Sequence, residues 1–243
     1  MKLATWNVEI PVSVRRRDAI RAHIDDVRAD VLVLTETHDG LLTGYASSVS
    51  SAPGRDGNRK PEHHWVTIWS NWELVPIATS DECRTVAARV LPESSDPFVI
   101  YGTVLPWLGS QWREHPSAGG VAFREALAVQ TADWLRIRHD YPGDELFVLG
   151  DFNQDMVSPK YYGSRANRTL LDSALLAAGL TAITAGGGDP IRRDSAPCAA
   201  IDHICANQDS AWHAEPAMRW PDEPVPVKWL SDHFGLSVVF IPV

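Results

Sequence analysis

The sequence is poor in cysteine: there are three in 243 residues, at positions 83, 198 and 205. No two of them have the CxxC spacing, which argues against a disulfide scaffold and against a cysteine zinc site. No stretch approaches the ~20 consecutive apolar residues that a membrane-spanning helix needs. The first residues, MKLATWNVEI, lack the apolar core and small-residue cleavage site of a secretory signal. We therefore expect a soluble, cytoplasmic protein without a membrane span.

Basic residues are also scarce, since 22 Lys and Arg stand against 31 Asp and Glu, for a net charge of −9. Proteins that bind long DNA usually present basic surface, because neutralising phosphates supplies most of their non-specific affinity. The local basic clusters at 15–17, 55–60 and 191–194 are typical of solvated loops or helix faces. The composition therefore disfavours a protein that tracks long DNA, and part of the acidity is available for a metal site.

The sequence does contain a series of short apolar runs of strand length, separated by turns. These runs cover 2–8, 30–35, 64–70, 84–91, 98–105, 145–151, 200–206 and 235–241. Apolar residues at helical spacing predict helices over 15–29, 122–139 and 167–179. No repeat, low-complexity tract or domain boundary interrupts the pattern. We expect one α/β domain over residues 1–243, with functional residues at the strand ends.

Polar side chains cluster where five of these runs end or begin. They are Asn7 and Glu9, Glu36, Asp151 and Asn153, Asp202, and Asp232 with His233. Burying such groups is costly unless a cation or a polar reaction requires them, so one convergent acidic site is the simplest interpretation. Carboxylate and amide oxygens suit hard divalent cations, and neither thiolates nor a histidine trio are available for zinc. We predict Mg²⁺ or Mn²⁺ and the hydrolysis of a phosphoester.

The motifs that carry these residues, TWNVE, LVLTE, LGDFN, IDHI and SDHFGL, occur in this order between residues 5 and 236. In this order the sequence resembles the endonuclease/exonuclease/phosphatase superfamily, which includes DNase I-like nucleases. The resemblance implies an α/β sandwich of four layers, with two packed mixed, mainly antiparallel β-sheets flanked by helices. It also implies a metal environment composed of Glu36 as principal ligand, with Asn7, Glu9 and Asp232.

The same resemblance implies roles for the remaining motif residues. Asp151 would orient or deprotonate the attacking water, and Asn153 would contact a phosphate oxygen or position Asp151. His233 would stabilise negative charge beside the scissile phosphate, and Asp202 would accept a hydrogen bond from it, as in other Asp–His pairs.

The sequence departs from the family pattern at Val104, where family members usually carry Tyr or His. Tyr101 lies three residues earlier, so strand alternation points it to the opposite face of the sheet. His115 in the following loop is a candidate substitute. Val104 puts the mode of phosphate or leaving-group contact in doubt and leaves the metal and water-activating positions intact.

Several other polar residues are expected to be structural. We interpret His203 as structural, His63 and His64 as surface or rim residues, and Asp155 as a solvated turn residue. The GGG at 186–188 lacks a following Lys-Ser/Thr and predicts a flexible loop rather than a P-loop.

Three functions are compatible with the sequence. The first is a phosphodiesterase or nuclease-type enzyme with a phosphoester substrate, for which nucleic acid is one candidate. The second is a phosphatase or phosphodiesterase for a small molecule or lipid head group. The third is a non-catalytic binding module on this fold. The loop from Trp107 to Trp112 could stack on an exposed base in the first case.

Overall fold

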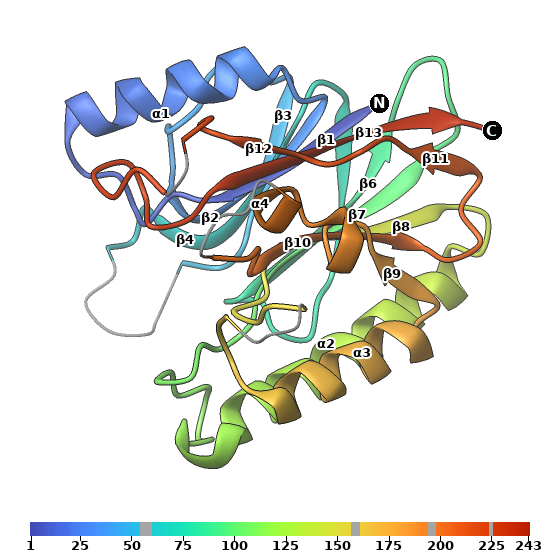
Figure 1. Cartoon of the computed structure of the whole chain (residues 1–243). Coiled ribbons are helices and arrows are strands. Elements are labelled where there is room, and N and C mark those ends of the chain that lie inside the picture. The colour runs from blue at the N-terminus through green and yellow to red at the C-terminus, as the bar shows by residue number, and fades with distance from the viewer. Residues whose placement is uncertain (54–59, 157–160, 194–197, 224–225) are drawn as a thin grey trace.

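The two β-sheets pack face to face, and helices cover the outer face of each sheet, so the chain forms four layers (Figure 1). The computed structural model describes residues 1–53, 60–156, 161–193, 198–223 and 226–243. Among these residues no helix is long and apolar enough to cross a membrane. The predicted architecture, a four-layer α/β sandwich, is confirmed. The extent of the domain, residues 1–243, stays a prediction.

The first sheet is built around the N-terminal and C-terminal strands. Its order is β11 (Trp212–Ala214), β13 (Gly235–Pro242), β1 (Lys2–Asn7), β2 (Val31–His38), β4 (His63–Ser70) and β3 (Ser47–Ser50), and β12 (Met218–Trp220) also pairs with β13. β1 and β2 are parallel, and the other strand pairs of this sheet are antiparallel. A parallel pair needs a crossover, which the helix α1 (Val14–Val27) supplies.

The second sheet is formed from the middle of the chain. Its order is β5 (Glu73–Ile77), β6 (Thr85–Leu91), β7 (Phe98–Val104), β8 (Glu145–Asp151), β10 (Asp202–Asn207) and β9 (Leu180–Ala182). The parallel pair here is β7 and β8, which the helix α2 (Val121–Asp140) connects. The remaining elements are α3 (Arg165–Ala177), α4 (Pro190–Arg193) and two 3₁₀ turns, η1 (Ala118–Gly120) and η2 (Gly186–Gly188).

Apolar side chains fill the space between the layers. Between the sheets, Phe147 lies against Phe98 and Phe240, with ring centroids 5.7 and 4.8 Å away. On one outer face α1 buries Ile20 against the first sheet. On the other, Trp134 of α2 meets Tyr101 edge to face, with ring centroids 6.2 Å apart. Burying side chains of this size stabilises the fold by about 1.5–3 kcal/mol each.

Five short strands were not predicted, namely β3, β5, β9, β11 and β12. They have three to five residues each and lie at or near the sheet edges. Edge strands bury only part of their side chains and therefore show little apolar alternation. The glycines at 186–188, for which a flexible loop was predicted, form a single 3₁₀ turn, and the flexibility of this segment stays a prediction.

Candidate active site

The strand directions bring the polar motif residues to one end of the sandwich. Parallel strands end at the same edge of a sheet, so Asn7, at the end of β1, lies beside Thr35 and next to Glu36 of β2. β10 runs antiparallel to β8, and Asp202 at its start is the register partner of Asp151. β13 is antiparallel to β1, so the segment just before β13 reaches the same end.

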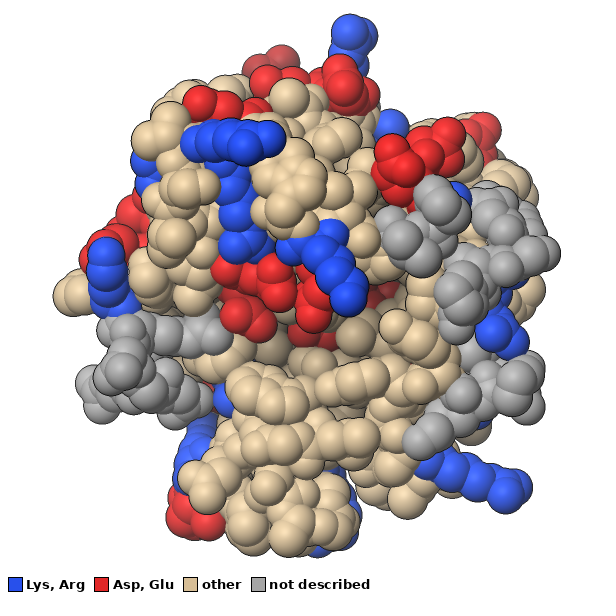
Figure 2. Space-filling model, turned by 60° about the vertical axis from the view of Figure 1, so that its left-hand side comes forward, with Lys and Arg blue, Asp and Glu red and all other residues tan. Residues whose placement is uncertain are grey.

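Asn7 joins the two sheets at this end. Its Nδ2 lies 3.3 Å from Oε1 of Glu36 and 3.1 Å from Oδ2 of Asp151, so one amide donates toward both carboxylates. Glu36 belongs to the first sheet and Asp151 to the second. In Figure 2 acidic side chains gather in a hollow near the centre of one face, with basic side chains beside them.

Asp151 is held by the turn that follows β8. The backbone N–H of Asn153 donates to its Oδ1 at 2.8 Å, and Asn153 Nδ2 donates to its Oδ2 at 2.9 Å. The same amide also donates to the carbonyl of Leu105 at 3.0 Å. Gly150 allows β7 to pack closely against β8 at this point, because a Cβ at residue 150 would lie 2.0 Å from the carbonyl oxygen of Thr103. Asp151 therefore enters the site with its orientation fixed.

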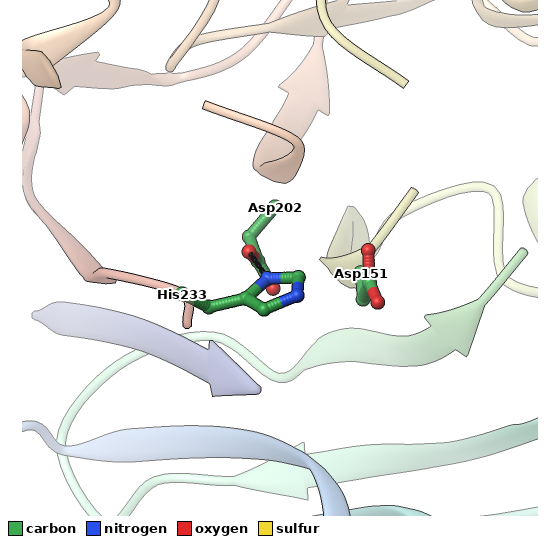
Figure 3. A group of neighbouring side chains, drawn as sticks. All are labelled: Asp151, Asp202 and His233. Carbon is green, nitrogen blue, oxygen red and sulfur yellow. Dashed lines mark hydrogen bonds and ion pairs between the residues drawn. The ribbon is translucent and has the colours of Figure 1, made fainter. Parts of the chain in front are cut away.

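His233 and Asp202 form a close pair next to Asp151 (Figure 3). Nδ1 of His233 lies 2.6 Å from Oδ2 of Asp202, and Nε2 lies 3.5 Å from Oδ1 of Asp232. One possible ligand atom each from Asp151, Asp202 and His233 lie within 4.8 Å of one another. Of these carboxylates, Asp151 and Asp202 are buried, whereas the side chain of Asp232 is 63% exposed.

The electrostatics of the cluster follow from burial and mutual proximity. Burial raises the pKa of Asp151 to about 7, with further contributions from Asp202 and Glu36, although His233 opposes the shift. Burial alone would lower the pKa of His233, but the charges of Asp202 and Asp151 outweigh it and raise that pKa to about 10. Near neutral pH the imidazole therefore carries a proton, while Asp151 is close to the midpoint of its titration.

Glu9 and Asp232 add two more carboxylates at the mouth of the site. Burial raises the pKa of Glu9, and the neighbouring Asp232 raises it further. Arg16 partly compensates, since its guanidinium donates to Glu9 Oε2 at 2.9 Å. The two acidic side chains therefore repel each other in the absence of a cation.

The backbone at several site residues is in the left-handed region. The φ angles are 46° at Glu9, 50° at Glu36 and 49° at Asn153. Asn tolerates this region, but for Glu it is uncommon and costs about 1–3 kcal/mol when the surrounding structure imposes it. Such strain concentrates at functional sites, which is in keeping with the position of Glu36 inside the cluster.

Three supporting residues were not predicted from the sequence. Ser231 Oγ donates to the carbonyl of Asn7 at 2.6 Å and accepts from the backbone N–H of His233 at 3.0 Å. Trp6 Nε1 donates to the carbonyl of His233 at 3.0 Å. Arg16 Nε donates to the carbonyl of Leu230 at 2.7 Å, so this residue of the 15–17 cluster is not simply a solvated side chain. Ser231 belongs to the SDHFGL motif and Trp6 to the TWNVE motif, and this position within a motif is the only signal that could have pointed to them.

The residues around the departure from the family pattern have clear positions. Val104 is fully buried in the core between the sheets, and Tyr101 lies in the opposite core, as strand alternation predicts. The imidazole of His115 stacks on Trp112 with ring centroids 5.6 Å apart. His203 is buried, with Nε2 2.9 Å from the carbonyl oxygen of Gln154, which agrees with a structural role.

Two predictions about surface residues are wrong. Asp155 is fully buried; its carboxylate accepts from the backbone N–H groups of Tyr161 and Tyr162 and pairs with Arg168. His63 and His64 are buried too, and Nε2 of His64 lies 3.0 Å from Oδ1 of Asp39. These partners lie far along the chain, so the local sequence does not indicate them.

Two packed mixed sheets, with an acid and histidine cluster at one end, define a DNase I-like α/β sandwich. The chain belongs to the Endonuclease/Exonuclease/phosphatase family, which it matches over residues 4–233. Members of this family are hydrolases that act on phosphoester bonds. No curated protein sequence matches the chain significantly.

Several solved structures have the same fold at low sequence identity. An endonuclease/exonuclease/phosphatase from Beutenbergia cavernae has 16% identity and a TM-score of 0.67, covering 100% of this chain and 71% of its own. A 3'-5' exonuclease from Neisseria meningitidis has 20% identity and a TM-score of 0.62, covering 99% of both chains. The catalytic domain of human Nocturnin, solved with a bound sulfate anion, has 16% identity and a TM-score of 0.65, covering 100% of this chain and 94% of its own. These likenesses concern the fold.

Proposed function

We propose that this protein is an Mg²⁺- or Mn²⁺-dependent phosphodiesterase of the nuclease type. The observation that carries the proposal is the contact of the Asn7 amide with both Glu36 and Asp151, next to the buried pair of His233 and Asp202. In this arrangement Asp151 would serve as the base, His233 as a cationic hydrogen-bond donor and the neighbouring carboxylates as oxygen ligands, all at one end of the sandwich.

The residues present suit a hard divalent cation. Glu36 and Asn7, together with Glu9 and Asp232, would hold it through oxygen atoms, the ligands that Mg²⁺ prefers. Two features of the site favour a cation here: the repulsion between Glu9 and Asp232, and the buried Oδ1 of Asp202, which has no hydrogen-bond partner among the described residues. When bound, the ion would act as a Lewis acid toward the phosphoryl group.

Asp151, Asp202 and His233 also come close enough to bind a cation. We prefer to assign them to proton transfer, because Oδ2 of Asp202 and Nδ1 of His233 already contact each other at 2.6 Å. An ion in direct contact with His233 would also displace the proton that its two acidic neighbours favour.

Asp151 would take a proton from the attacking water. A base works best when its pKa lies near the working pH, and the pKa of Asp151 is about 7. Asn153 and Asn7 fix the carboxylate by donating to it, so no rotation is needed before the proton transfer. The oxygen of the water forms the new bond to phosphorus, and the ester oxygen departs with the electron pair of the broken bond and takes a proton from solvent.

His233 would donate a hydrogen bond to a non-bridging phosphate oxygen as negative charge develops there. Asp202 lies against Nδ1, which leaves Nε2 directed toward the phosphate side of the pair. A cationic donor preorganised in this way stabilises the transition state more than the ground state.

The charge of the protein bears on the class of substrate. The net charge of −9 disfavours continuous tracking along DNA, so a short or single-stranded nucleic acid fits better than a long duplex. A small-molecule or lipid-head-group ester remains the second candidate within the same chemistry. A non-catalytic binding module has Val104 as its only support. It is disfavoured because the residues proposed for metal binding and proton transfer are retained, namely Glu36, Asp151, Asn153, Asp202, Asp232 and His233.

The test is Mg²⁺-dependent turnover of bis-p-nitrophenyl phosphate compared with p-nitrophenyl phosphate, with EDTA as the metal-free control. We expect faster turnover of the diester, abolished by EDTA. Asp151→Asn and His233→Gln should each lower kcat by about 10²- to 10⁴-fold while circular dichroism stays unchanged. Asp140→Asn, an exposed change on α2, should leave kcat unaltered. Full activity in either site variant would refute the assigned roles.

If neither nitrophenyl ester turns over, a panel of labelled single-stranded and duplex DNA should follow. Failure of the wild-type protein to cleave any of these substrates in Mg²⁺ or Mn²⁺ would reject the proposed nuclease-type function.

A further inference from the structure

Three large aromatic side chains are exposed among the described residues: Trp107 at 39%, Tyr161 at 47% and Trp229 at 51%. All three lie in loops at the active-site end. Tyr161 lines a small cavity with Asp202 and His233, and Trp229 lies three residues before Asp232. Trp107 lies two residues after Leu105, whose carbonyl accepts from Asn153. Exposed aromatic surface concentrated around a site points to a ligand with a flat, apolar part.

Trp107 is the best placed of the three, because its neighbours fix it beside the cluster. Its ring lies 6.1 Å from that of Trp65, centroid to centroid. The register of β2 and β4 pairs Thr35 with Val66 and Thr37 with His64, so Trp65 stands opposite Glu36. On the other side of the site, the backbone N–H of Leu105 donates to the carbonyl of Asp151 at 2.9 Å. These contacts connect the loop of Trp107 to the Glu36 side of the site through Trp65 and to the Asp151 side through Leu105.

A buried cation supports this indole from within the protein. The guanidinium carbon of Arg84 lies 4.2 Å from the ring centroid of Trp65 and 5.6 Å from that of Trp107. Arg84 is itself anchored, since its Nη2 donates to Ser110 Oγ at 3.0 Å and reaches the carbonyl oxygen of Gln111 at 3.4 Å. Cation–π contacts of this kind hold the ring in place while part of its surface stays in solvent.

The second tryptophan of the same loop has a different role. Trp112 is buried, its Nε1 donates to Asp81 Oδ2 at 2.6 Å, and one face of its ring is covered by His115. It serves to fix the loop. Of the two tryptophans considered from the sequence, Trp107 alone presents surface to a ligand.

We propose that Trp107 is a specificity-determining residue that stacks on an unpaired nucleobase attached to the scissile phosphate. This inference rests on the proposed function. It specifies the substrate class as single-stranded nucleic acid or a nucleotide ester. Base stacking on an exposed aromatic ring does not depend on base sequence, and it supplies affinity without requiring an extended basic surface, which a net charge of −9 disfavours.

The test uses two substrates with a single phosphodiester each, so the scissile bond is defined. One is the dinucleotide thymidylyl-thymidine, and the other is the same diester with tetrahydrofuran in place of both nucleosides. Trp107→Ala should raise KM for the thymidine diester about tenfold or more with little change in kcat. The base-free diester should show no such change. Trp107→Phe should keep most of the affinity.

Leu108→Ala is the matched control, because Leu108 is the next residue and is 47% exposed. It should leave both substrates unaffected, and thermal denaturation should confirm that the Trp107 variants are folded. An equal rise in KM for both diesters in Trp107→Ala would overturn the proposal. The ring would then contact the sugar or the phosphate, or would only support the loop.

A binding measurement separates this inference from the proposed function. The fluorescence of a 2-aminopurine trinucleotide should be quenched when it binds the Asp151→Asn protein in Mg²⁺. The double variant that also carries Trp107→Ala should show no such quenching. If the wild-type protein cleaves no phosphoester, the proposed function fails and this quenching still decides whether Trp107 stacks on a base. Quenching that is absent, or that persists without Trp107, would contradict the inference.

Discussion

Replacing Asp202 with Asn should change how the stability of the protein depends on pH. Asp202 Oδ2 lies 2.6 Å from Nδ1 of His233, and the pKa of that imidazole is raised to about 10 against the ordinary 6.5. A group whose pKa is higher in the folded than in the unfolded protein stabilises the fold. This stabilisation is complete at a pH below the unfolded-state pKa and is lost as the pH rises through the folded-state pKa. For His233 that window runs from about pH 6.5 to about pH 10.

The magnitude follows from linkage. Each pH unit between the two pKa values corresponds to about 1.4 kcal/mol, so the His233 contribution lost between pH 7 and pH 10 is about 3 to 4 kcal/mol. An opposite charge in contact shifts a pKa by about 1 to 3 pH units. Without the charge of Asp202, the loss between these two pH values should therefore shrink by about 1 to 3 kcal/mol.

Urea denaturation at pH 7 and pH 10, in EDTA, measures how much the free energy of unfolding falls between these two pH values. Comparing the two pH values within each protein cancels both the constant cost of the substitution and the titration of distant groups. Asp26→Asn, an exposed change on α1, is the control and should reproduce the wild-type difference. If Asp202→Asn also reproduces it, Asp202 does not hold the charge of His233 and the proposed donor role loses its basis.

Three further results are expected. Glu36→Gln should weaken Mg²⁺ binding in calorimetry by about tenfold or more, while exposed Glu93→Gln should not; equal affinities would exclude Glu36 as a ligand. At limiting Mg²⁺, kcat/KM should rise as the pH passes about 7, where Asp151 ionises. Added Mg²⁺ should shift this rise to lower pH, because a nearby cation favours the carboxylate. A rise whose pH midpoint does not depend on Mg²⁺ would place the ion away from Asp151. Val104→Ala should cost about 1–3 kcal/mol of stability and leave KM unchanged, since Val104 fills the inner core; lost activity in a fully stable variant would show that it contacts substrate.

The long buried strands and the residues at their ends could be predicted from the sequence. β8 was placed at 145–151, as observed, because four consecutive apolar residues at 146–149 are followed at once by residues that favour a turn. The proximity of Glu36 and Asp151 was expected because polar residues recur at five strand ends and because the motifs resemble one family, and the 3.1 and 3.3 Å contacts of Asn7 agree with it. The apolar runs indicate the strands, and the motifs at their ends indicate which ends meet.

Features that depend on distant partners could not be predicted. Asp155 resembles any acidic residue in a turn, and its burial depends on Arg168 of α3, thirteen residues further along. His64 is buried within β4, and its partner Asp39 comes from the end of the neighbouring strand, 25 residues away in the sequence. A three-residue edge strand such as β11 is too short for any alternation to show. Only the packed fold determines these pairings.

The most direct test of the central claim is a crystal structure with Mn²⁺ soaked in, with data collected to show its anomalous scattering. We expect an anomalous peak within bonding distance of a Glu36 oxygen, at the end of the sandwich that also carries Asp151 and His233. A peak bound elsewhere, or no peak at a Mn²⁺ concentration that supports turnover, would contradict it.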